Sequence, residues 1–377
     1  MEMEKQLAEL ISRIRPLDRE AMKLASDRQA YLAKPPGSLG QLEDISIKIA
    51  GITGKAKDND VTKQGIVVMS SDNGVVEEGV ASAPQSVTMS QTINFTRRYT
   101  GVSSMAKYFD IDLLVVDLGV AMDIPEELYT ENMVTEDGNI PVKIVNRKLS
   151  RGTKNLAKEA AMTREQAVKA LLTGIEAAKA MKDSGRTLFG VGEMGIGNTT
   201  TSSAVLGAIT KTDASVLVGR GGGLNDEGLA KKNRIVDNAI KKCEGMDIID
   251  ILANIGGYDI CAMAGAFLGA AIYRIPAVID GFISVVAACA AHEMCPAVTD
   301  FLFTSHKSFE IGYNIAIDRL NLKPMFDLGM RLGEGSGCPI AFKIIETAVA
   351  SMNIMKTLDE AAVDSEYLEE IRRDNLF

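Results

Sequence analysis

Two glutamates in glycine-rich loops are the residues of this sequence most suited to chemistry. Glu334 lies between Gly333 and Gly335 in the run DLGMRLGEGSGCP, and Glu193 lies in the run TLFGVGEMGIGNTTTSSA. A carboxylate inside a glycine-rich loop has little packing to do, and burial would raise its pKa towards neutrality. We therefore expect Glu334 to act as a general base, and Glu193 to have a role beyond the binding of phosphate.

The loop around Glu193 also predicts a seat for phosphate. A short apolar run at residues 187–189 is typical of the end of a buried strand, and residues 202–209 read as a helix of small residues. Glycines recur between them at every second or third position, and helix-capping side chains follow. Backbone N–H groups at such a helix start converge where the helix dipole favours negative charge. The residues expected there are Gly195, Gly197, Asn198 and Thr199.

Two alternatives to a phosphate seat remain open for the same loop. Gly190, Gly192 and Gly195 have the spacing G-x-G-x-x-G, which also occurs in dinucleotide-binding sites. Such a site requires an acid at the end of a second strand to bind the ribose hydroxyl. The next apolar run, residues 215–218, ends in glycine and arginine instead. The second alternative is a tight turn that only packs a helix on a sheet.

Three further polar loops follow predicted strands. SSDNG begins at Ser70, GRGGGLNDEGLAKKNRI contains Lys231 and Lys232, and SHKSFEIGY contains Ser308. A lysine one or two turns into a helix can reach back to an anion at the helix start. For either lysine taken alone, a solvent-exposed helix face is the competing interpretation.

The order of the predicted elements indicates what positions these loops. Residues 1 to about 55 read as helical, and strands alternate with helices from about residue 60 onward. Helices are predicted at 87–109 and at 163–183, the second with a capping box at Thr163 and Gln166. The predicted strands are residues 65–69, 112–116, 142–145, 187–189, 216–218, 277–279 and 301–303. This alternation predicts an α/β fold with a doubly wound, mainly parallel sheet that binds ligands at the carboxyl ends of its strands.

Composition excludes several classes of function. The 377 residues carry a net charge of −9 without a long basic run, which argues against binding to nucleic acid or anionic membranes. Only two histidines are present, so a multi-histidine metal site is excluded by count. The five cysteines show no C-x-x-C spacing, which is typical of reduced thiols in a cytoplasmic protein. We find neither a signal peptide nor a membrane span, and we expect no metal.

Six motifs together resemble one enzyme family. KPPGSLG, SSDNGVVEEGV, GEMGIGNTT, GRGGGLNDEGLAKK, SHKSFEIG and LGMRLGEGSG occur in this order between Lys34 and Gly337. They are similar to motifs of the nicotinate-nucleotide:dimethylbenzimidazole phosphoribosyltransferases, which assemble the lower ligand of cobalamin. The resemblance implies that nicotinate leaves C1 of the phosphoribosyl group in nicotinate mononucleotide. A nitrogen of 5,6-dimethylbenzimidazole then takes its place with inversion, which gives α-ribazole 5′-phosphate.

The resemblance also implies a fold, an assembly and a set of site residues. It implies a Rossmann-like large domain at residues 61–344, a small helical domain at 1–60 with 345–377, and a homodimer that needs no cofactor. Catalysis is implied for Glu334, as the general base, and for Glu193. Residues implied to bind the donor phosphate and ribose are Gly195, Gly197, Asn198, Thr199, Gly221, Lys232 and Ser308. Residues implied to line the acceptor pocket are Asp72, Asn73, Ala81, Ser82, Ala83, Gln85, Met194 and Leu332.

Three segments depart from the usual family pattern, and the resemblance implies that all of them border the acceptor pocket or its supports. The chain reads DNG at 72–74, VASAP at 80–84 and EIGY at 310–313, where relatives commonly read DHG, VSAYP and EPGH. The loss of hydroxyl, aromatic and imidazole groups leaves a phenolic acceptor, used by one subunit of a heteromer, as an alternative. Two further alternatives rank below the phenolic acceptor. One is a nucleotide-binding relative without activity, and the other is a dinucleotide-dependent oxidoreductase.

Overall fold

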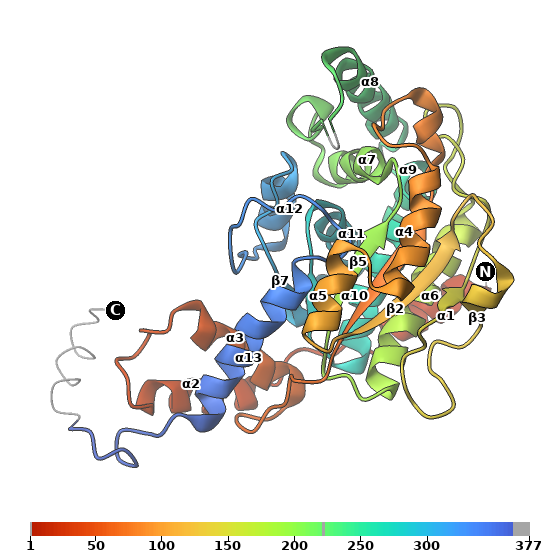
Figure 1. Cartoon of the computed structure of the whole chain (residues 1–377). Helices are drawn as coiled ribbons and strands as arrows, with labels where there is room; N and C mark the ends of the chain where they lie inside the picture. Colours follow the sequence, from red (N-terminus) through yellow and green to blue (C-terminus); the bar gives the residue numbers. More distant parts are fainter. Residues whose placement is uncertain (1, 221–222, 365–377) are drawn as a thin grey trace.

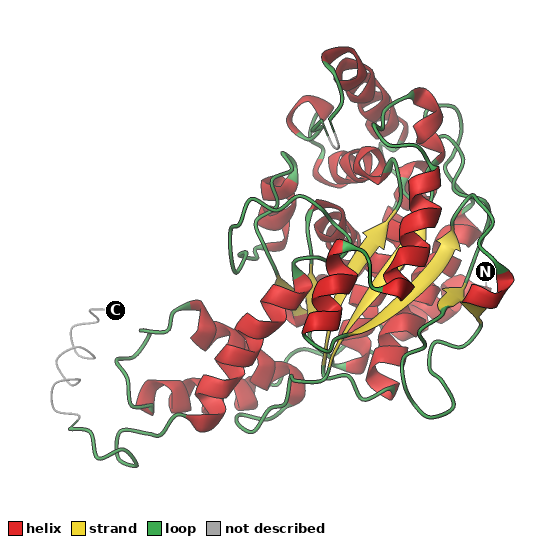
Figure 2. Cartoon of the chain, in the orientation of Figure 1, coloured by secondary structure: helices red, strands yellow, loops and turns green. Residues whose placement is uncertain are grey.

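The computed structural model describes residues 2–220 and 223–364, and within them it contains a seven-stranded sheet (Figures 1 and 2). The strand order is β3-β4-β2-β1-β5-β6-β7, and each neighbouring pair is parallel. The strands are β1 (Gln64–Ser71), β2 (Asp112–Gly119), β3 (Tyr129–Thr130), β4 (Ile144–Asn146), β5 (Leu188–Met194), β6 (Ala277–Ile279) and β7 (Leu302–Thr304). The chain winds from the central β1 to both edges, so the predicted doubly wound α/β fold is confirmed.

Helices cover both faces of the sheet. On one face α4 (Ser86–Arg97), α5 (Gly101–Tyr108) and α13 (Cys338–Ile354) contact the strands. On the other face lies α10 (Tyr258–Tyr273), with α6 (Arg164–Asp183) packed against it. Because both faces are covered, every residue of β1 is buried, and the middle of the strand, residues 66–69, is continuously apolar.

The other helices lie around this central layer. They are α1 (Glu2–Ile11), α2 (Arg19–Tyr31), α3 (Gln41–Thr53), α7 (Asn198–Thr210), α8 (Asp226–Lys242), α9 (Ile248–Ile255), α11 (Phe282–Met294) and α12 (Tyr313–Leu320). In Figure 1, α2 and α3 pack with α13 at one end of the molecule, whereas α1 packs on α6. The predicted division of the chain into a small helical domain (1–60 with 345–377) and a large domain (61–344) stays a prediction. Part of that small domain, residues 365–377, lies outside the described residues. Among the described helices, none has both the length and the apolar character that a membrane crossing requires.

Two predicted elements are wrong. The helix predicted at 87–109 is two helices, because Arg98 adopts a left-handed conformation (φ 62°) and Thr100 starts α5 with a capping box. The strand predicted at 216–218 does not form, and residues 214–216 adopt a 3₁₀ helix instead. An apolar triplet is too short for its periodicity to distinguish a strand from a helical turn. The capping box of Thr163 and Gln166 is confirmed at the start of α6.

Strand β5 extends further than the sequence predicts and includes two glycines that were assigned to the loop. A Cβ atom at Gly192 would lie 2.2 Å from the carbonyl oxygen of Glu334, and one at Gly190 would lie 2.6 Å from the side chain of Cys338. These glycines therefore allow the segment around residues 334–338 to approach the sheet. Gly195 is the one member of the G-x-G-x-x-G spacing that lies beyond the strand. The spacing thus reflects packing, which removes the basis of the dinucleotide interpretation.

Helices α6 and α10 are in backbone contact. A Cβ atom at Gly174 in α6 would lie 1.8 Å from the carbonyl oxygen of Ala262, and one at Gly265 in α10 would lie 1.9 Å from that of Leu171. Each glycine therefore faces the backbone of the other helix. Any side chain at either position would push apart the two helices that cover this face of the sheet.

Replacement of Gly265 by alanine should destabilise the protein. The added methyl group would overpack the contact between α6 and α10, which typically costs about 1–3 kcal/mol of unfolding free energy. Gly228→Ala in α8 is the matched control, because a Cβ atom there would come no closer than 3.2 Å to any atom, and its nearest neighbours are the side chains of Asn225 and Leu224. Urea unfolding followed by circular dichroism measures both variants, and equal midpoints would contradict the interpretation.

Candidate active site

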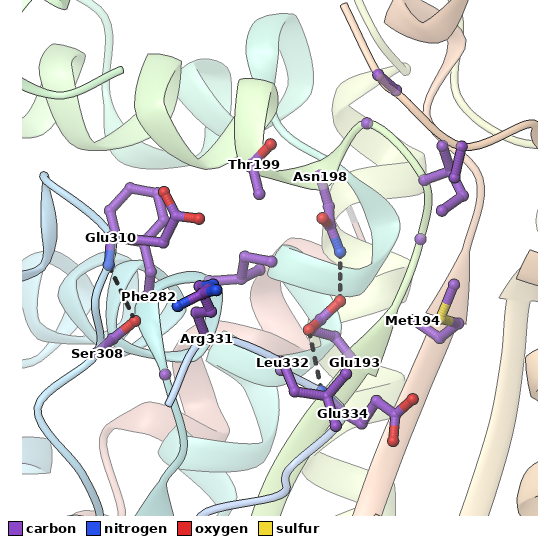
Figure 3. Close-up of a pocket in the computed structure, with 18 of the residues that line it drawn as sticks. Glu193, Met194, Asn198, Thr199, Phe282, Ser308, Glu310, Arg331, Leu332 and Glu334 are labelled. Atoms are coloured by element: carbon purple, nitrogen blue, oxygen red, sulfur yellow. Dashed lines mark hydrogen bonds between the residues drawn. The ribbon is translucent and has the colours of Figure 1, made fainter. Parts of the chain in front are cut away.

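A cavity of about 580 Å³ opens beyond the carboxyl ends of β5, β6 and β7 (Figure 3). The order of strands reverses between β1 and β5, and doubly wound sheets bind ligands at such a point. The walls come from residues 80–83, from the turn between β5 and α7, from the start of α11 and from residues 331–334. The predicted site residues that line it are Ala81, Ser82, Ala83, Glu193, Met194, Gly195, Gly197, Asn198, Thr199, Ser308, Leu332 and Glu334.

Glu334 lies on the cavity wall in a left-handed turn. Its φ is 63°, between 84° at Gly333 and 92° at Gly335. Its Oε2 atom accepts a hydrogen bond of 3.1 Å from the N–H of Val102, at the start of α5. Burial raises the pKa of Glu334, and hydrogen bonds from the first residues of α5 oppose that rise. The carboxylate is therefore fixed in place and more basic than an exposed glutamate.

Asp280 holds the loop that carries Glu334. It follows β6 directly, and its carboxylate accepts hydrogen bonds from the N–H groups of Gly335 (2.9 Å) and Gly337 (2.7 Å). Burial raises the pKa of Asp280 to about 7. This residue was not among the predicted site residues, although an acid immediately after a predicted strand was a signal that could have identified it.

Glu193 connects the two loops of the site. One of its carboxylate oxygens accepts a hydrogen bond from the side chain of Asn198, at the start of α7 (Figure 3). The other accepts one of 3.4 Å from the N–H of Glu334. Burial raises the pKa of Glu193 to about 8, and the charges of Asp259 and Asp280 add to the rise. Glu193 is therefore protonated near neutral pH.

The start of α7 and Lys232 form the cationic end of the site. Lys232 lies behind the cavity wall, where its Nζ donates to the hydroxyl of Thr199 (3.0 Å) and to the carbonyl of Gly219 (3.3 Å). Burial lowers the pKa of Lys232 to about 8, and the charge of Glu310 raises it. Lys231 instead forms an ion pair of 3.1 Å with Glu78.

Three residues predicted for the acceptor pocket do not line this cavity. Asp72 and Asn73 are completely buried, and Asp72 accepts a hydrogen bond of 2.8 Å from the N–H of Ala121. They are enclosed because the start of the loop after β1 is bonded to the segments around residues 119–121 and 153, and because Asn73 packs beneath the turn that contains Gly195 and Gly197. Gln85 is half-buried at the N-cap of α4. Gly221, predicted to bind phosphate, lies outside the described residues.

The cavity wall also contains side chains that were not predicted to belong to the site. Among them are Arg220, Asp280, Phe282, His306, Glu310 and Arg331. His306 is buried, and burial lowers its pKa to about 4, so its imidazole is neutral at pH 7. In residues 2–220 and 223–364, no group of three or more histidine, cysteine or acidic side chains is arranged to hold a metal ion.

Comparisons with known proteins all indicate one family. A family profile described as phosphoribosyltransferase matches residues 14–363. A protein of Clostridium perfringens (strain ATCC 13124) named nicotinate-nucleotide–dimethylbenzimidazole phosphoribosyltransferase is 52% identical over 373 residues, which cover 98% of this chain and 99% of the relative. A protein of the same name from Clostridium tetani (strain E88) is 47% identical over 98% of each chain. The crystal structure of CobT from Thermus thermophilus superposes with a TM-score of 0.85 at 36% identity, over 92% of this chain and 99% of that one.

Glu193→Gln should weaken the dependence of stability on pH. The pKa of Glu193 rises from 4.5 in the unfolded chain to about 8 in the folded protein. Between these values the folded state binds more protons than the unfolded state, so the free energy of unfolding falls as the pH rises. Glutamine cannot ionise, so the variant should lose this part of the fall, which melting temperatures from about pH 5 to about pH 8.5 would measure.

The control for this measurement is Glu227→Gln, because Glu227 is exposed on α8. That variant should keep the slope of the unmodified protein. Asp259 and Asp280, whose pKa values burial raises to about 7, should leave a residual slope in Glu193→Gln. A slope unchanged by Glu193→Gln would refute the assignment.

Proposed function

The chain belongs to the nicotinate-nucleotide:dimethylbenzimidazole phosphoribosyltransferase family, and from this premise we propose that it transfers the 5-phosphoribosyl group of nicotinate mononucleotide to 5,6-dimethylbenzimidazole. The products are α-ribazole 5′-phosphate and nicotinate, and the reaction supplies the lower ligand of cobalamin. The observation that carries the proposal is the buried Glu334 carboxylate, which the start of α5 fixes on the wall of a cavity that also contains the start of α7.

Glu334 is the general base of the proposed reaction. A neutral benzimidazole is a poor nucleophile, so the proton on its second nitrogen has to leave as the first nitrogen bonds to C1. The bond between C1 and nicotinate breaks on the opposite face, and the proton passes to Glu334. Nicotinate needs no acid to leave, because its ring nitrogen is cationic in the donor and becomes neutral when the bond breaks.

The donor phosphate binds at the start of α7, beside Thr199, Lys232 and Ser308. Thr199 lines the cavity and accepts a hydrogen bond from the buried Lys232, so its hydroxyl is free to donate to the phosphate, and the ammonium charge lies directly behind it. Gly195, Gly197, Asn198 and, by family resemblance, Gly221 complete the donor site. Binding of the phosphate, which does not react, orients the ribose so that C1 faces Glu334.

Glu193 acts by positioning. It accepts hydrogen bonds both from Asn198 and from the N–H of Glu334, so it links the proposed phosphate turn to the loop that carries the base. A change in either loop would therefore alter the distance between the base and C1.

The acceptor lies against small and apolar side chains. Residues 81–83 are alanine, serine and alanine, and Met194 and Leu332 are apolar. Such a wall makes few polar demands and discriminates weakly between flat aromatic rings. For that reason phenol and p-cresol are the second candidate acceptors.

Incubation of the purified protein with nicotinate mononucleotide and a panel of benzimidazoles and phenols tests the proposal. Mass spectrometry should identify α-ribazole 5′-phosphate. A phosphoribosylated phenol as the dominant product would support the second candidate. Release of no nicotinate with any acceptor would refute phosphoribosyl transfer.

The proposal extends to assembly and location. By family resemblance we infer a homodimer that acts in the cytoplasm, with a small helical domain formed by both ends of the chain. Exposed apolar side chains on α2 and α13, such as Leu24 and Ile354, support an interface there. Light scattering after size exclusion would measure the mass, and a monomer at micromolar concentration would contradict the dimer.

Glu334→Gln should abolish most turnover and leave donor binding intact. Glutamine keeps the shape of the side chain but cannot accept the proton, and loss of a general base typically costs a hundredfold or more in rate. Single-turnover kinetics would measure the rate, and calorimetry the affinity for nicotinate mononucleotide. A near-normal rate would remove Glu334 from the mechanism.

Lys232→Ala should mainly weaken binding of the donor, because it removes a charged contact to the phosphate. The expected rise in Kd is roughly tenfold to a hundredfold. Lys231→Ala is the matched control, since Lys231 is the adjacent lysine and pairs with Glu78. If Lys231→Ala weakens the donor and Lys232→Ala does not, the wrong lysine is assigned.

A further inference from the structure

The cavity has an unpaired guanidinium on its wall. Of the described residues that line it, two are arginines, Arg220 and Arg331. Arg220 is engaged by the carboxylate of Asp226 and donates to the carbonyl of Leu224 (2.9 Å). Within residues 2–220 and 223–364, Arg331 forms no ion pair, and its guanidinium carbon lies 5.3 Å from the centre of the Phe309 ring.

The Phe309 ring lies beside Arg331. The N–H of Phe309 donates to the carbonyl of Met330 (3.1 Å), so the backbones of the two segments are joined at the residue that precedes Arg331. A guanidinium stacked on an aromatic ring keeps the edge with its N–H groups free for a planar anion. In Figure 3 this group lies between the side of the cavity with Ser308 and Glu310 and the side with Glu193.

The charges of the cavity and of the proposed donor require such a cation. Four carboxyl groups line the cavity, those of Glu193, Asp280, Glu310 and Glu334. Nicotinate mononucleotide brings two more anions, the phosphate on C5 of its ribose and the carboxylate on its pyridine ring. In the proposed site, the start of α7 and the charge of Lys232 bind the phosphate. The carboxylate of the ring needs a separate partner, because an anion in a cavity lined by acids is costly unless it is paired.

The location of Arg331 suits the second anion. Arg331 precedes Glu334 by three residues. Both lie on the loop whose N–H groups, at Gly335 and Gly337, donate to the carboxylate of Asp280. In the proposed reaction the acceptor and Glu334 lie on one face of C1, and the nicotinate ring leaves from the opposite face. The guanidinium of Arg331 lies across the cavity from the carboxylate of Glu334, towards Ser308 and Glu310 (Figure 3), which suits a contact with the leaving ring.

We propose that Arg331 binds the ring carboxylate of nicotinate mononucleotide and so makes the enzyme select nicotinate over nicotinamide as the leaving group. The planar fork of arginine matches a carboxylate with two parallel hydrogen bonds, whereas the neutral carboxamide of nicotinamide mononucleotide offers a single acceptor oxygen. This inference rests on the proposed function, since it assigns a residue to one part of the proposed donor.

Calorimetric titration of the unmodified protein and of Arg331→Met, with nicotinate mononucleotide and with nicotinamide mononucleotide, tests the inference. The two ligands share the ribose and phosphate and differ only in the ring substituent. Methionine keeps an apolar side chain on Phe309 but removes the fork. Kd for nicotinate mononucleotide should rise about tenfold to a hundredfold, and Kd for nicotinamide mononucleotide should stay within about threefold.

Two further variants sharpen the test. Arg331→Lys keeps the charge but not the fork, so it should lie between the unmodified protein and Arg331→Met. Arg319→Met removes a positive charge that pairs with Glu293, away from the cavity, and should leave both affinities unchanged.

Each remaining outcome overturns the inference. Equal loss of affinity for both mononucleotides would mean that Arg331 binds the phosphate or supports the fold, and no loss for either would mean that it does not contact the donor. Because binding is measured without an acceptor, the inference can fail while the unmodified protein still makes product. An unmodified protein that binds the donor but transfers nothing would instead refute the proposed function.

Discussion

The left-handed turn at Gly333, Glu334 and Gly335 is the constraint on which the site depends. A left-handed conformation costs a residue with a side chain about 1–2 kcal/mol, so Glu334 keeps its φ of 63° only because its surroundings hold it there. Asp280 binds two N–H groups of the loop, and Gly192 leaves room for its backbone. The start of α5 binds the carboxylate itself. These three supports come from separate parts of the chain.

Protonation and hydrogen bonds from backbone N–H groups explain how several acids are buried near one another. Glu193, Asp259 and Asp280 have pKa values raised to about 7 or 8 by burial, and backbone N–H groups rather than buried cations provide most of their hydrogen bonds. Their protonated forms reduce the negative charge of the cavity near neutral pH. That reduction makes the cavity more compatible with the anionic donor that we propose.

The topology of the sheet brings these parts together. β1 lies between β2 and β5, and the chain runs from β1 to β2 before it later crosses back to β5 and continues to β6, so the connections after β1 and β5 run in opposite directions and open a crevice. Glu193 is the penultimate residue of β5, Asp280 follows β6 and Ser308 follows β7, so one edge of the sheet presents residues separated by more than a hundred positions in the sequence. Gly174 and Gly265 allow α6 and α10, the helices on one face of the sheet, to pack closely against each other.

The sequence alone determined the fold class and the family, and it singled out Glu334 and Glu193, which both line the cavity. Alternation of strands with helices and a capping box at Thr163 are local patterns, and the family motifs are contiguous runs of residues, so both can be read without coordinates. Tertiary structure alone decided that Gly190 and Gly192 serve packing, that Asp72 and Asn73 are enclosed, and that Asp280 and Arg331 reach the cavity. Those outcomes depend on which distant segment lies against a residue, and spacing along the chain carries no information about that contact.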